Sequence, residues 1–202
     1  KRILGEYDAL ICRNADYTAD VIQAGKKLKV IARHGVGVDN IDVAEATRRG
    51  IWVVNGPGSN VVAVAEYTMA MIAALATRFR EAEKHTRAGD WSFRTGADRH
   101  DLANSTLGIL GFGHIGQETA RIASEGFRMK IVTCASPEKR RTLKNIEYVD
   151  SLFEVAQRSD YVSVHLPLTS STRGLINREF FLHMKPTAYL INCARGEICN
   201  TE

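Results

Sequence analysis

The chain has 202 residues, enough for one large or two small domains with cores of their own. Its net charge of +4 is mild and dispersed, and its longest apolar run, residues 61–76, is short for a membrane span. We therefore expect neither nucleic acid nor a membrane as a partner. The four cysteines have no C-x-x-C spacing, which favours reduced thiols and a cytoplasmic location.

The first 59 residues alternate short apolar runs with short helical patterns. Strands are expected over residues 7–12, 28–32 and 51–54. Helices are expected between them over residues 19–24, where Thr18 could be the cap, and over residues 43–49. This alternation predicts a parallel sheet with helices on its faces.

A long apolar segment follows, and we place the domain boundary just before it, between residues 1–59 and 60–202. Residues 61–84 are predicted to form one helix that is apolar nearly all round and therefore buried on more than one side. Residues 87–104 are predicted to be a surface excursion carrying Trp91 and Phe93. The helix and the excursion together favour a homodimer.

A glycine motif follows the strand predicted over residues 107–110. Gly111, Gly113 and Gly116 have the spacing G-x-G-x-x-G, and a helix over residues 115–125 and a strand over residues 130–134 are expected next. In a dinucleotide site the first glycine permits a tight turn, the second admits a pyrophosphate, and the third lets the helix pack closely. The helix N-terminus favours an anion, so the turn, with His114 and Ile115, is predicted to bind the cofactor. The alternative is a glycine turn kept only for close packing.

The remaining elements complete a second strand–helix series. Strands are expected over residues 146–149, 161–165 and 188–193, and helices over residues 151–157, after a possible Asp150 cap, and 178–184. The fold class is therefore α/β, with a Rossmann-type doubly wound parallel sheet in the second part. Both domains are expected to be incomplete within these 202 residues.

The choice of cofactor depends on a residue about 20 positions beyond the glycines, where an NAD site has an acid. Ser136 stands there, and Arg140 and Arg141 follow it. A hydroxyl and two guanidinium groups suit a 2′-phosphate, so NADP is favoured over NAD. The alternative is a solvated basic turn, with NAD held by other contacts.

Three stretches together resemble a known family. They are residues 34–42 (HGVGVDNID), the glycine turn of residues 111–116, and residues 184–196 (MKPTAYLINCARG). In this order they resemble the D-isomer-specific 2-hydroxyacid dehydrogenases, most closely the 3-phosphoglycerate dehydrogenase branch. The resemblance covers the whole chain and implies a flavodoxin-like substrate domain, built from both chain ends, with a nucleotide-binding domain inserted. The reaction it implies is reversible hydride transfer between a nicotinamide ring and a 2-hydroxy or 2-oxo acid.

Arg195 is the residue predicted to be catalytic. It follows the last strand, where its guanidinium can hold a substrate carboxylate and polarise a 2-oxo group. The resemblance places a loop of Gly35, Val36 and Gly37 in the substrate cleft, where bare N–H groups can receive a carboxylate. Arg13 is expected to meet a substrate phosphate or carboxylate, or else to be a solvated arginine. The cofactor cleft is expected to be lined by His165, Leu166, Pro167, Cys193 and Ala194, with His165 not acting as the acid, and no metal site is predicted.

The family's general acid is a histidine, oriented by a glutamate, and both come well after the arginine. Residues 196–202 contain no histidine, so this chain is expected to bind cofactor but to turn over poorly or not at all. The alternative function is a non-enzymatic, dinucleotide-sensing, corepressor-like binding protein on the same scaffold. A formate dehydrogenase is disfavoured, because formate has no 2-hydroxyl. The substrate stays open among phosphoglycerate, glyoxylate, hydroxypyruvate and lactate.

Overall fold

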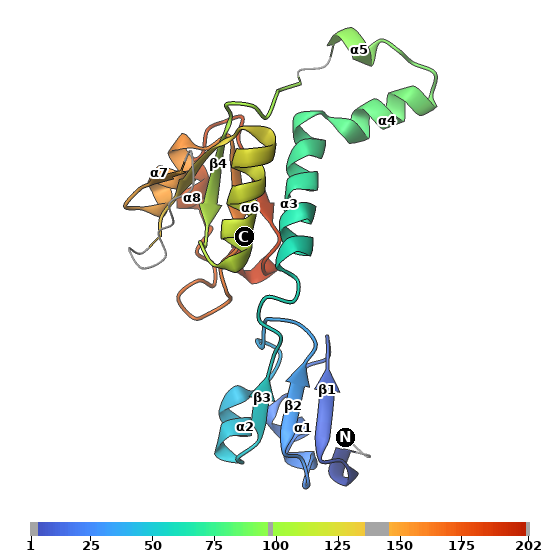
Figure 1. The fold of residues 1–202 in the computed structure, drawn as a ribbon, viewed down its shortest axis with the longest axis vertical. Helices are drawn as coiled ribbons and strands as arrows, with labels where there is room; N and C mark the ends of the chain where they lie inside the picture. Colours follow the sequence, from blue (N-terminus) through green and yellow to red (C-terminus); the bar gives the residue numbers. More distant parts are fainter. Residues whose placement is uncertain (1–3, 97–98, 136–145, 201–202) are drawn as a thin grey trace. The chain divides into compact units, whose positions relative to one another are not determined.

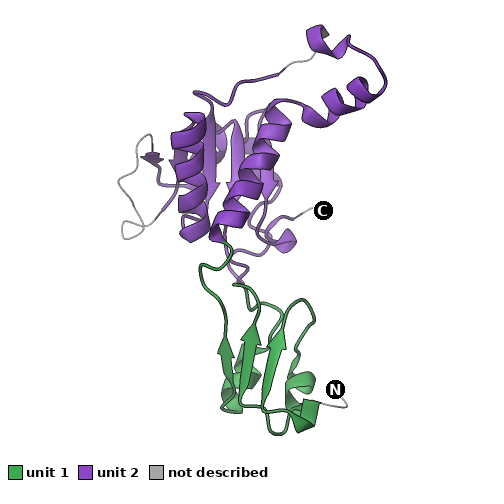
Figure 2. Cartoon of the chain, turned by 45° about the vertical axis from the view of Figure 1, so that its right-hand side comes forward, with its two compact units in different colours: residues 1–60 green, residues 61–202 purple. Residues whose placement is uncertain are grey.

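The computed structural model describes residues 4–96, 99–135 and 146–200 (Figure 1). The chain divides into two compact units, Lys1–Asn60 and Val61–Glu202 (Figure 2). Each unit is a parallel sheet with helices, which confirms the predicted α/β class.

The first unit has three strands, β1 (Ala9–Cys12), β2 (Val30–Arg33) and β3 (Trp52–Val54), paired in parallel in the order β1-β2-β3. Its crossovers contain the helices α1 (Ala19–Ala24) and α2 (Val43–Arg48). Right-handed crossovers that advance in one direction place their helices on the same face of a sheet. That face is the core of the unit, made by Cys12, Ile22, Leu28, Ile31, Ile41, Ala46 and Ile51.

The opposite face of this sheet is apolar and open. The register pairs Val30 with Trp52 in one row, and Ile11 with Ala32 and Ala32 with Val54 in another. Residues two apart in a strand point to one face, so these rows lie side by side. Ile11 is 79% exposed and Trp52 is 75% exposed, which shows that no described helix of the first unit covers this face.

The second unit has a five-stranded parallel sheet in the order β6-β5-β4-β7-β8. Its strands are β4 (Thr106–Leu110), β5 (Lys130–Thr133), β6 (Ile146–Tyr148), β7 (Tyr161–Val164) and β8 (Tyr189–Asn192). The order reverses at β4, since β5 and β6 lie on one side of it and β7 and β8 on the other. Crossovers of one hand that run in two directions place helices on both faces.

Both faces of this sheet are covered (Figure 1). One face packs against α3 (Val61–Ala76) and α6 (His114–Arg121), through side chains that include Leu107 and Ile109. The other packs against α7 (Leu152–Arg158) and α8 (Arg178–His183), through side chains that include Leu110. Strands buried on two sides read as continuous apolar runs, which is why they were visible in the sequence.

The single helix predicted over residues 61–84 is wrong. The chain forms two helices, α3 and α4 (Phe79–Arg87), with a bend of 61° between them. Arg78 stands at the break with a left-handed φ of +50°, a conformation that cannot continue a right-handed helix. Within this unit α3 has one buried face, which includes Ile72, and one exposed face, on which Tyr67 is 63% exposed.

Among the described residues no single helix has the length and apolarity to cross a membrane, and only α3 and α4, counted together as a bent pair, reach those limits.

Three smaller expectations also needed correction. Thr18 occupies the N-cap position of α1, but its hydroxyl donates to Asp20 and makes no cap bond. The cap of α7 is Ser151 rather than Asp150, because Ser151 and Glu154 form a reciprocal capping box. The helix expected over residues 115–125 is α-helical only as far as Arg121 and ends in a π-helical segment, Ile122–Gly126, in which Ser124 is buried. Strand ends differ from expectation by one or two residues.

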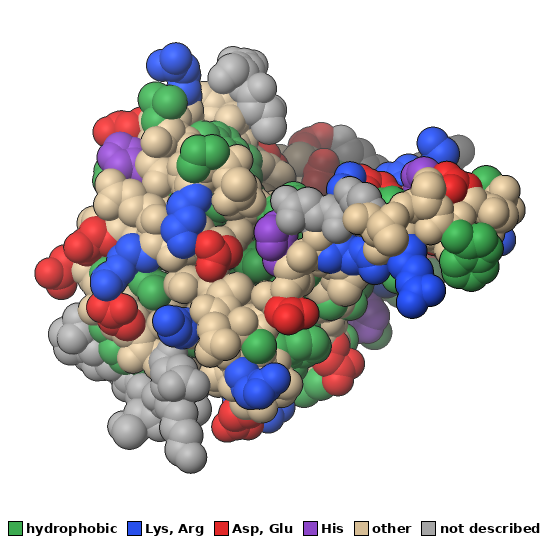
Figure 3. Space-filling model, turned by 90° about the horizontal axis from the view of Figure 1, so that it is seen from above, with side chains coloured by type: hydrophobic (Ala, Val, Ile, Leu, Met, Phe, Trp, Pro, Cys, Tyr) green, Lys and Arg blue, Asp and Glu red, His purple; other side chains and the backbone are tan. Residues whose placement is uncertain are grey.

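Residues 79–96 form a projecting arm of the second unit, built by α4 and the short helix α5 (Phe93–Gly96) (Figures 1 and 3). Figure 3 shows Lys and Arg side chains beside a hydrophobic group on the arm. Phe79 is 61% exposed and Trp91 is 70% exposed. The first part of the excursion predicted over residues 87–104 therefore belongs to a partly helical arm that begins earlier, at Phe79.

Candidate functional site: a dinucleotide crevice and a carboxylate loop

The strand order of the second unit reverses at β4, and the carboxyl edge of the sheet at that point is the candidate crevice. In open parallel sheets, ligands bind at the carboxyl ends of strands, where the order reverses. The turn of residues 111–113 follows β4, the loop of residues 165–167 follows β7, and the loop of residues 193–195 follows β8. The structure thus brings together, at one edge of the sheet, the described residues that the sequence predicted for the cofactor.

The first and third glycines of the motif are required by the fold. Gly111 has a φ of +96°, and a Cβ there would lie 2.7 Å from the carbonyl oxygen of His165. A Cβ on Gly116 would lie 2.2 Å from the carbonyl oxygen of Gly111. These two residues therefore have the turn and packing roles that the spacing predicted.

The second glycine is different. Gly113 is the N-cap of α6 with a φ of −82°, which any residue adopts, and a Cβ built there has no described neighbour within 4 Å. The fold itself therefore does not require glycine at this position. The space lies beside the N-terminus of α6, whose first N–H groups and dipole favour an anion. A dinucleotide pyrophosphate fits this donor set.

His165 forms part of the wall of the crevice. Its backbone N–H donates to the carbonyl oxygen of Leu110 at 2.7 Å, and its Nε2 lies 2.8 Å from the hydroxyl of Ser163. Burial lowers the pKa of His165 to about 4. The imidazole is therefore uncharged at neutral pH, which suits a lining role better than that of a proton donor.

The loop of residues 165–167 is fixed by a hydroxyl that sequence reasoning missed. Thr172 Oγ1 donates to the carbonyl oxygen of Pro167 at 2.6 Å and accepts from the N–H of Thr169 at 2.8 Å. The run of Thr and Ser after Pro167 is typical of such local side-chain bonds and was the available signal.

A side chain at the end of β8 holds the loop that carries Arg195. Asn192 Nδ2 donates to the carbonyl oxygen of Arg195 at 2.8 Å, and Asn192 Oδ1 accepts from the N–H of Ala194 at 3.0 Å. Cys193 lies against α3, with its Sγ 3.9 Å from Met71 Sδ. Arg195 is half-buried at the carboxyl end of β8, and its Nη1 donates to the carbonyl oxygen of Ala194. Sequence reasoning missed Asn192, although it immediately precedes the Cys-Ala-Arg stretch.

In the first unit, the loop of residues 35–37 follows β2 and is held by its neighbours. Asn55 Nδ2 donates to the carbonyl oxygen of Val36 at 2.6 Å, and the N–H of Gly56 donates to that of Gly35 at 3.0 Å. Asn40 Nδ2 donates to the carbonyl oxygen of Arg13 at 3.2 Å. The segments that follow β1, β2 and β3 are thus tied together at one edge. The side chain of Arg13 is exposed, which leaves both of its expected roles open.

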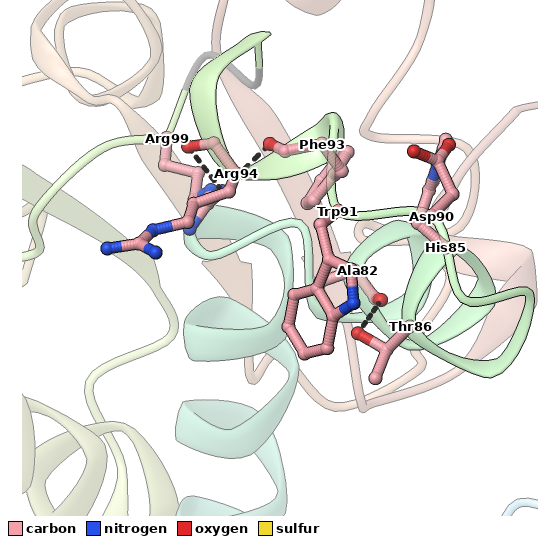
Figure 4. Close-up of a pocket in the computed structure, with 8 residues that line it drawn as sticks. All are labelled: Ala82, His85, Thr86, Asp90, Trp91, Phe93, Arg94 and Arg99. Atoms are coloured by element: carbon pink, nitrogen blue, oxygen red, sulfur yellow. Dashed lines mark hydrogen bonds and ion pairs between the residues drawn. The ribbon is translucent and has the colours of Figure 1, made fainter.

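A separate pocket of about 170 Å³ lies on the arm (Figure 4). Its polar groups bind one another. His85 Nδ1 lies 2.6 Å from Asp90 Oδ2, and Arg99 donates to the carbonyl oxygens of Phe93 and Arg94. Arg99 and His85 also lie over the Phe93 ring, at 5.0 and 5.1 Å from its centroid. These contacts account for the pocket as the packing of the arm.

Three of the predicted cofactor residues, Ser136, Arg140 and Arg141, lie outside the described residues. Within the described ranges, no group of three His, Cys, Asp or Glu side chains is placed to hold a metal ion.

Comparison with known proteins gives independent evidence about the family of this chain. Residues 69–202 match the family model of the D-isomer specific 2-hydroxyacid dehydrogenase NAD binding domain. A hydroxypyruvate reductase of Thermotoga maritima is 43% identical over 202 residues, which are 100% of this chain and 65% of the relative. A D-3-phosphoglycerate dehydrogenase of Synechocystis is 41% identical over 99% of this chain and 36% of its own length. The chain therefore spans no more than about two thirds of these relatives.

A solved structure of NAD-dependent formate dehydrogenase from Staphylococcus aureus, in complex with NAD, superposes with a TM-score of 0.89. It is 32% identical, and the match covers 98% of this chain and 60% of that one. The fold alone thus does not separate a formate enzyme from a 2-hydroxyacid enzyme. The family match and the curated relatives decide the family: this chain belongs to the D-isomer-specific 2-hydroxyacid dehydrogenases.

Proposed function

We propose that the protein is an NAD(P)-dependent oxidoreductase that transfers a hydride between a nicotinamide dinucleotide and a 2-hydroxy or 2-oxo acid. The observation that carries the proposal is the open space at Gly113, at the start of α6 and at the point of strand reversal. The names of the two curated relatives support the same reaction and substrate class. No observation favours a binding protein without activity.

Each group at the carboxyl edge of the second sheet, and the loop of residues 35–37 in the first unit, then has a role. Gly113, His114, Ile115 and Gly116 bind the pyrophosphate through the helix N-terminus, and Gly111 sets the turn. His165, Leu166, Pro167, Cys193 and Ala194 line the crevice and exclude water. When bound, the nicotinamide ring supplies or accepts the hydride. Arg195 polarises the 2-oxo oxygen on which negative charge develops. In the loop of Gly35, Val36 and Gly37, the N–H groups of Val36 and Gly37 receive the carboxylate, whereas the N–H of Gly35 donates to the carbonyl oxygen of Arg33 at 2.9 Å.

NADP is proposed as the preferred cofactor, on the residues Ser136, Arg140 and Arg141 of the sequence. Calorimetric titration with NADPH and with NADH tests this directly. Tighter binding of NADPH, lost in the double variant Arg140→Ala, Arg141→Ala, is the expected result. Tighter binding of NADH would contradict the 2′-phosphate argument and leave the reaction class intact.

Turnover is the test of the reaction class. The protein at its natural length is expected to oxidise the reduced dinucleotide in the presence of hydroxypyruvate or glyoxylate, and to lose this activity in Arg195→Met. The polypeptide of residues 1–202 is expected to bind dinucleotide with little or no turnover, because no histidine follows Arg195 in it. Absence of turnover with every 2-oxo acid in the protein at its natural length would contradict the proposal.

A homodimer in the cytoplasm is the proposed assembly. The exposed faces of α3 and of the arm carry large apolar side chains, among them Tyr67, Phe79 and Trp91, which favour burial against a second copy. The cysteines of the chain are free thiols, as in a reducing compartment. Sedimentation is expected to give a dimer, and a monomer at high concentration would contradict the assembly.

A further inference from the structure

Arg33, the last residue of β2, lies beneath the loop of residues 35–37 and joins its two ends. Its Nε donates to the carbonyl oxygen of Gly37 at 3.0 Å, and its Nη1 donates to that of His34 at 3.1 Å. The guanidinium carbon would lie 3.5 Å from a Cβ on Gly35, so the loop passes directly over it. Neither sequence motif nor spacing had singled out this half-buried side chain.

Together with the bonds from Asn55 and Gly56, this contact leaves no carbonyl of the loop free. The oxygens of His34, Gly35, Val36 and Gly37 all accept hydrogen bonds from protein groups. In a trans peptide the N–H points opposite to the carbonyl of the same peptide unit, and the described chain has no cis peptide. Fixing the carbonyls therefore fixes the direction of the N–H groups.

Three successive N–H groups consequently point away from the protein groups that bind the carbonyl oxygens of the same peptide units. They belong to Val36, Gly37 and Val38, and they have no acceptor among the described residues. Unpaired N–H dipoles in sequence, backed by a guanidinium charge on the far side of the loop, form a binding site for an anion. The carbonyl oxygens that would repel an anion are held toward Arg33 and its neighbours.

We infer that Arg33 is a positioning residue for substrate carboxylate binding. It acts through its Nε and Nη1, which each donate to a carbonyl oxygen of the loop. It sets the orientation of the loop so that the N–H groups face a carboxylate. The inference rests on the proposed function and adds to it the device that prepares the loop before the substrate arrives, which lowers the ordering cost of binding.

The test is a kinetic comparison of variants in the protein at its natural length. Arg33→Met is expected to raise the KM for glyoxylate and for a phosphorylated 2-oxo acid about tenfold, with kcat and NAD(P)H affinity changed less than about threefold. Equal factors for the two substrates are expected, since Arg33 acts on the shared carboxylate only. Arg33→Lys cannot span two carbonyls from one nitrogen and is expected to restore little of the loss.

Arg49→Met is the matched control. Arg49 is a half-buried arginine of the same unit whose Nη1 donates to the carbonyl oxygen of Ile22, outside the loop. It is expected to lower the unfolding temperature without raising KM. If Arg33→Met does not fold, Arg33→Lys carries the test, with a KM raised at least about threefold in a folded protein.

Three outcomes would overturn the inference. If Arg33→Met and Arg49→Met have the same KM, Arg33 is a purely structural residue. Full recovery in Arg33→Lys, or a larger effect for the phosphorylated substrate, would show that the charge itself contacts the substrate. Absence of turnover in the unsubstituted protein would refute the proposed function and with it the inference. This outcome is distinguished from the other two because it is seen without any substitution.

Discussion

The two sheets of this protein are built from the same strand–helix–strand unit but differ in the direction in which their crossovers run. The order β1-β2-β3 advances one way, whereas β6-β5-β4-β7-β8 reverses at β4. The first sheet consequently has helices on one face and an open apolar face, while the second is buried on both. The reversal of strand order therefore determines both how much of the sheet is buried and where a ligand can bind.

Substitutions at the glycines that follow β4 are expected to have the largest effect on the unfolding free energy. Gly116→Ala would place a Cβ 2.2 Å from a backbone oxygen, so α6 must move away from β4. We expect the second unit to lose about 4 kcal/mol or more of unfolding free energy, as for severe overpacking. Gly113→Ala, in open space at an ordinary φ, is the matched control. Urea unfolding that gives equal losses for both would contradict the close packing at Gly116.

One isoleucine in each sheet allows the covered face to be compared with the open one. Ile109 in β4 is fully buried against α3 and α6, whereas Ile11 in β1 is 79% exposed. Ile109→Ala is expected to cost about 3 kcal/mol through lost burial and a cavity. Ile11→Ala is expected to stay within about 0.5 kcal/mol. A large loss for Ile11→Ala in urea unfolding would mean that another part of the assembled protein covers the open face.

The buried imidazole at the crevice gives the second unit a pH dependence of its own. The pKa of His165 is about 4 in the folded state, below its usual 6.5, so the unfolded chain binds the proton first as pH falls. The contribution is present above pH 6.5 and is lost as pH falls toward 4. We expect a loss of about 2 kcal/mol over this window.

The measurement is urea unfolding at pH 7 and at pH 4.5. Carboxyl groups titrate in the same range, so His165→Asn is compared with the unsubstituted protein at each pH. The difference between the two is expected to shrink as pH falls. A difference that does not change with pH would contradict a buried, neutral His165.

The side chain of Asn192 shows how the loop of residues 193–195 differs from the loop of residues 35–37. The loop that carries Arg195 is held by a side chain of β8 itself, whereas the loop of residues 35–37 is held partly by the segment that follows β3. Asn192→Asp keeps the acceptor for the N–H of Ala194 but removes the donor to Arg195. We expect kcat/KM to fall about tenfold, which is about 1.4 kcal/mol, with little change in dinucleotide affinity. Unchanged kinetics would show that this bond does not position Arg195.

The helix caps give the smallest effect. Ser151→Ala removes a capping box of α7 in the second unit and is expected to cost about 1 kcal/mol. Thr18→Ala in the first unit removes a hydroxyl that makes no cap bond, and is expected to be nearly neutral. Thermal unfolding of the two variants checks the pair, and equal shifts would contradict the assigned caps.

Much of the second unit could be predicted from the sequence, because its information is local. Strands buried on both faces are continuous apolar runs, and the glycine spacing fixes a turn that needs no distant partner. The break at Arg78 could not be predicted in this way. Apolar residues continue up to it, and its left-handed conformation leaves no mark on the hydrophobic pattern.

The residues that hold the site loops were also missed, for a related reason. Arg33 acts through carbonyl groups, which every residue has, and Asn55 reaches Val36 across the sheet edge. The bond from Asn55 depends on strands far apart in sequence lying side by side, whereas the bonds of Arg33 are local and depend on the conformation of the loop. Their donors look like ordinary polar residues until the fold is known.

The open space at Gly113 is proposed to receive a dinucleotide, and calorimetric titration of a single variant tests this. Unsubstituted protein and Gly113→Ala are titrated with NADH and with NADPH, after matching unfolding curves establish that both are folded. The account predicts binding by the unsubstituted protein and a loss of about tenfold or more in Gly113→Ala, because the new methyl group occupies the space that the pyrophosphate needs. Equal affinities in the two proteins would contradict it, and would leave the second glycine without a role in binding.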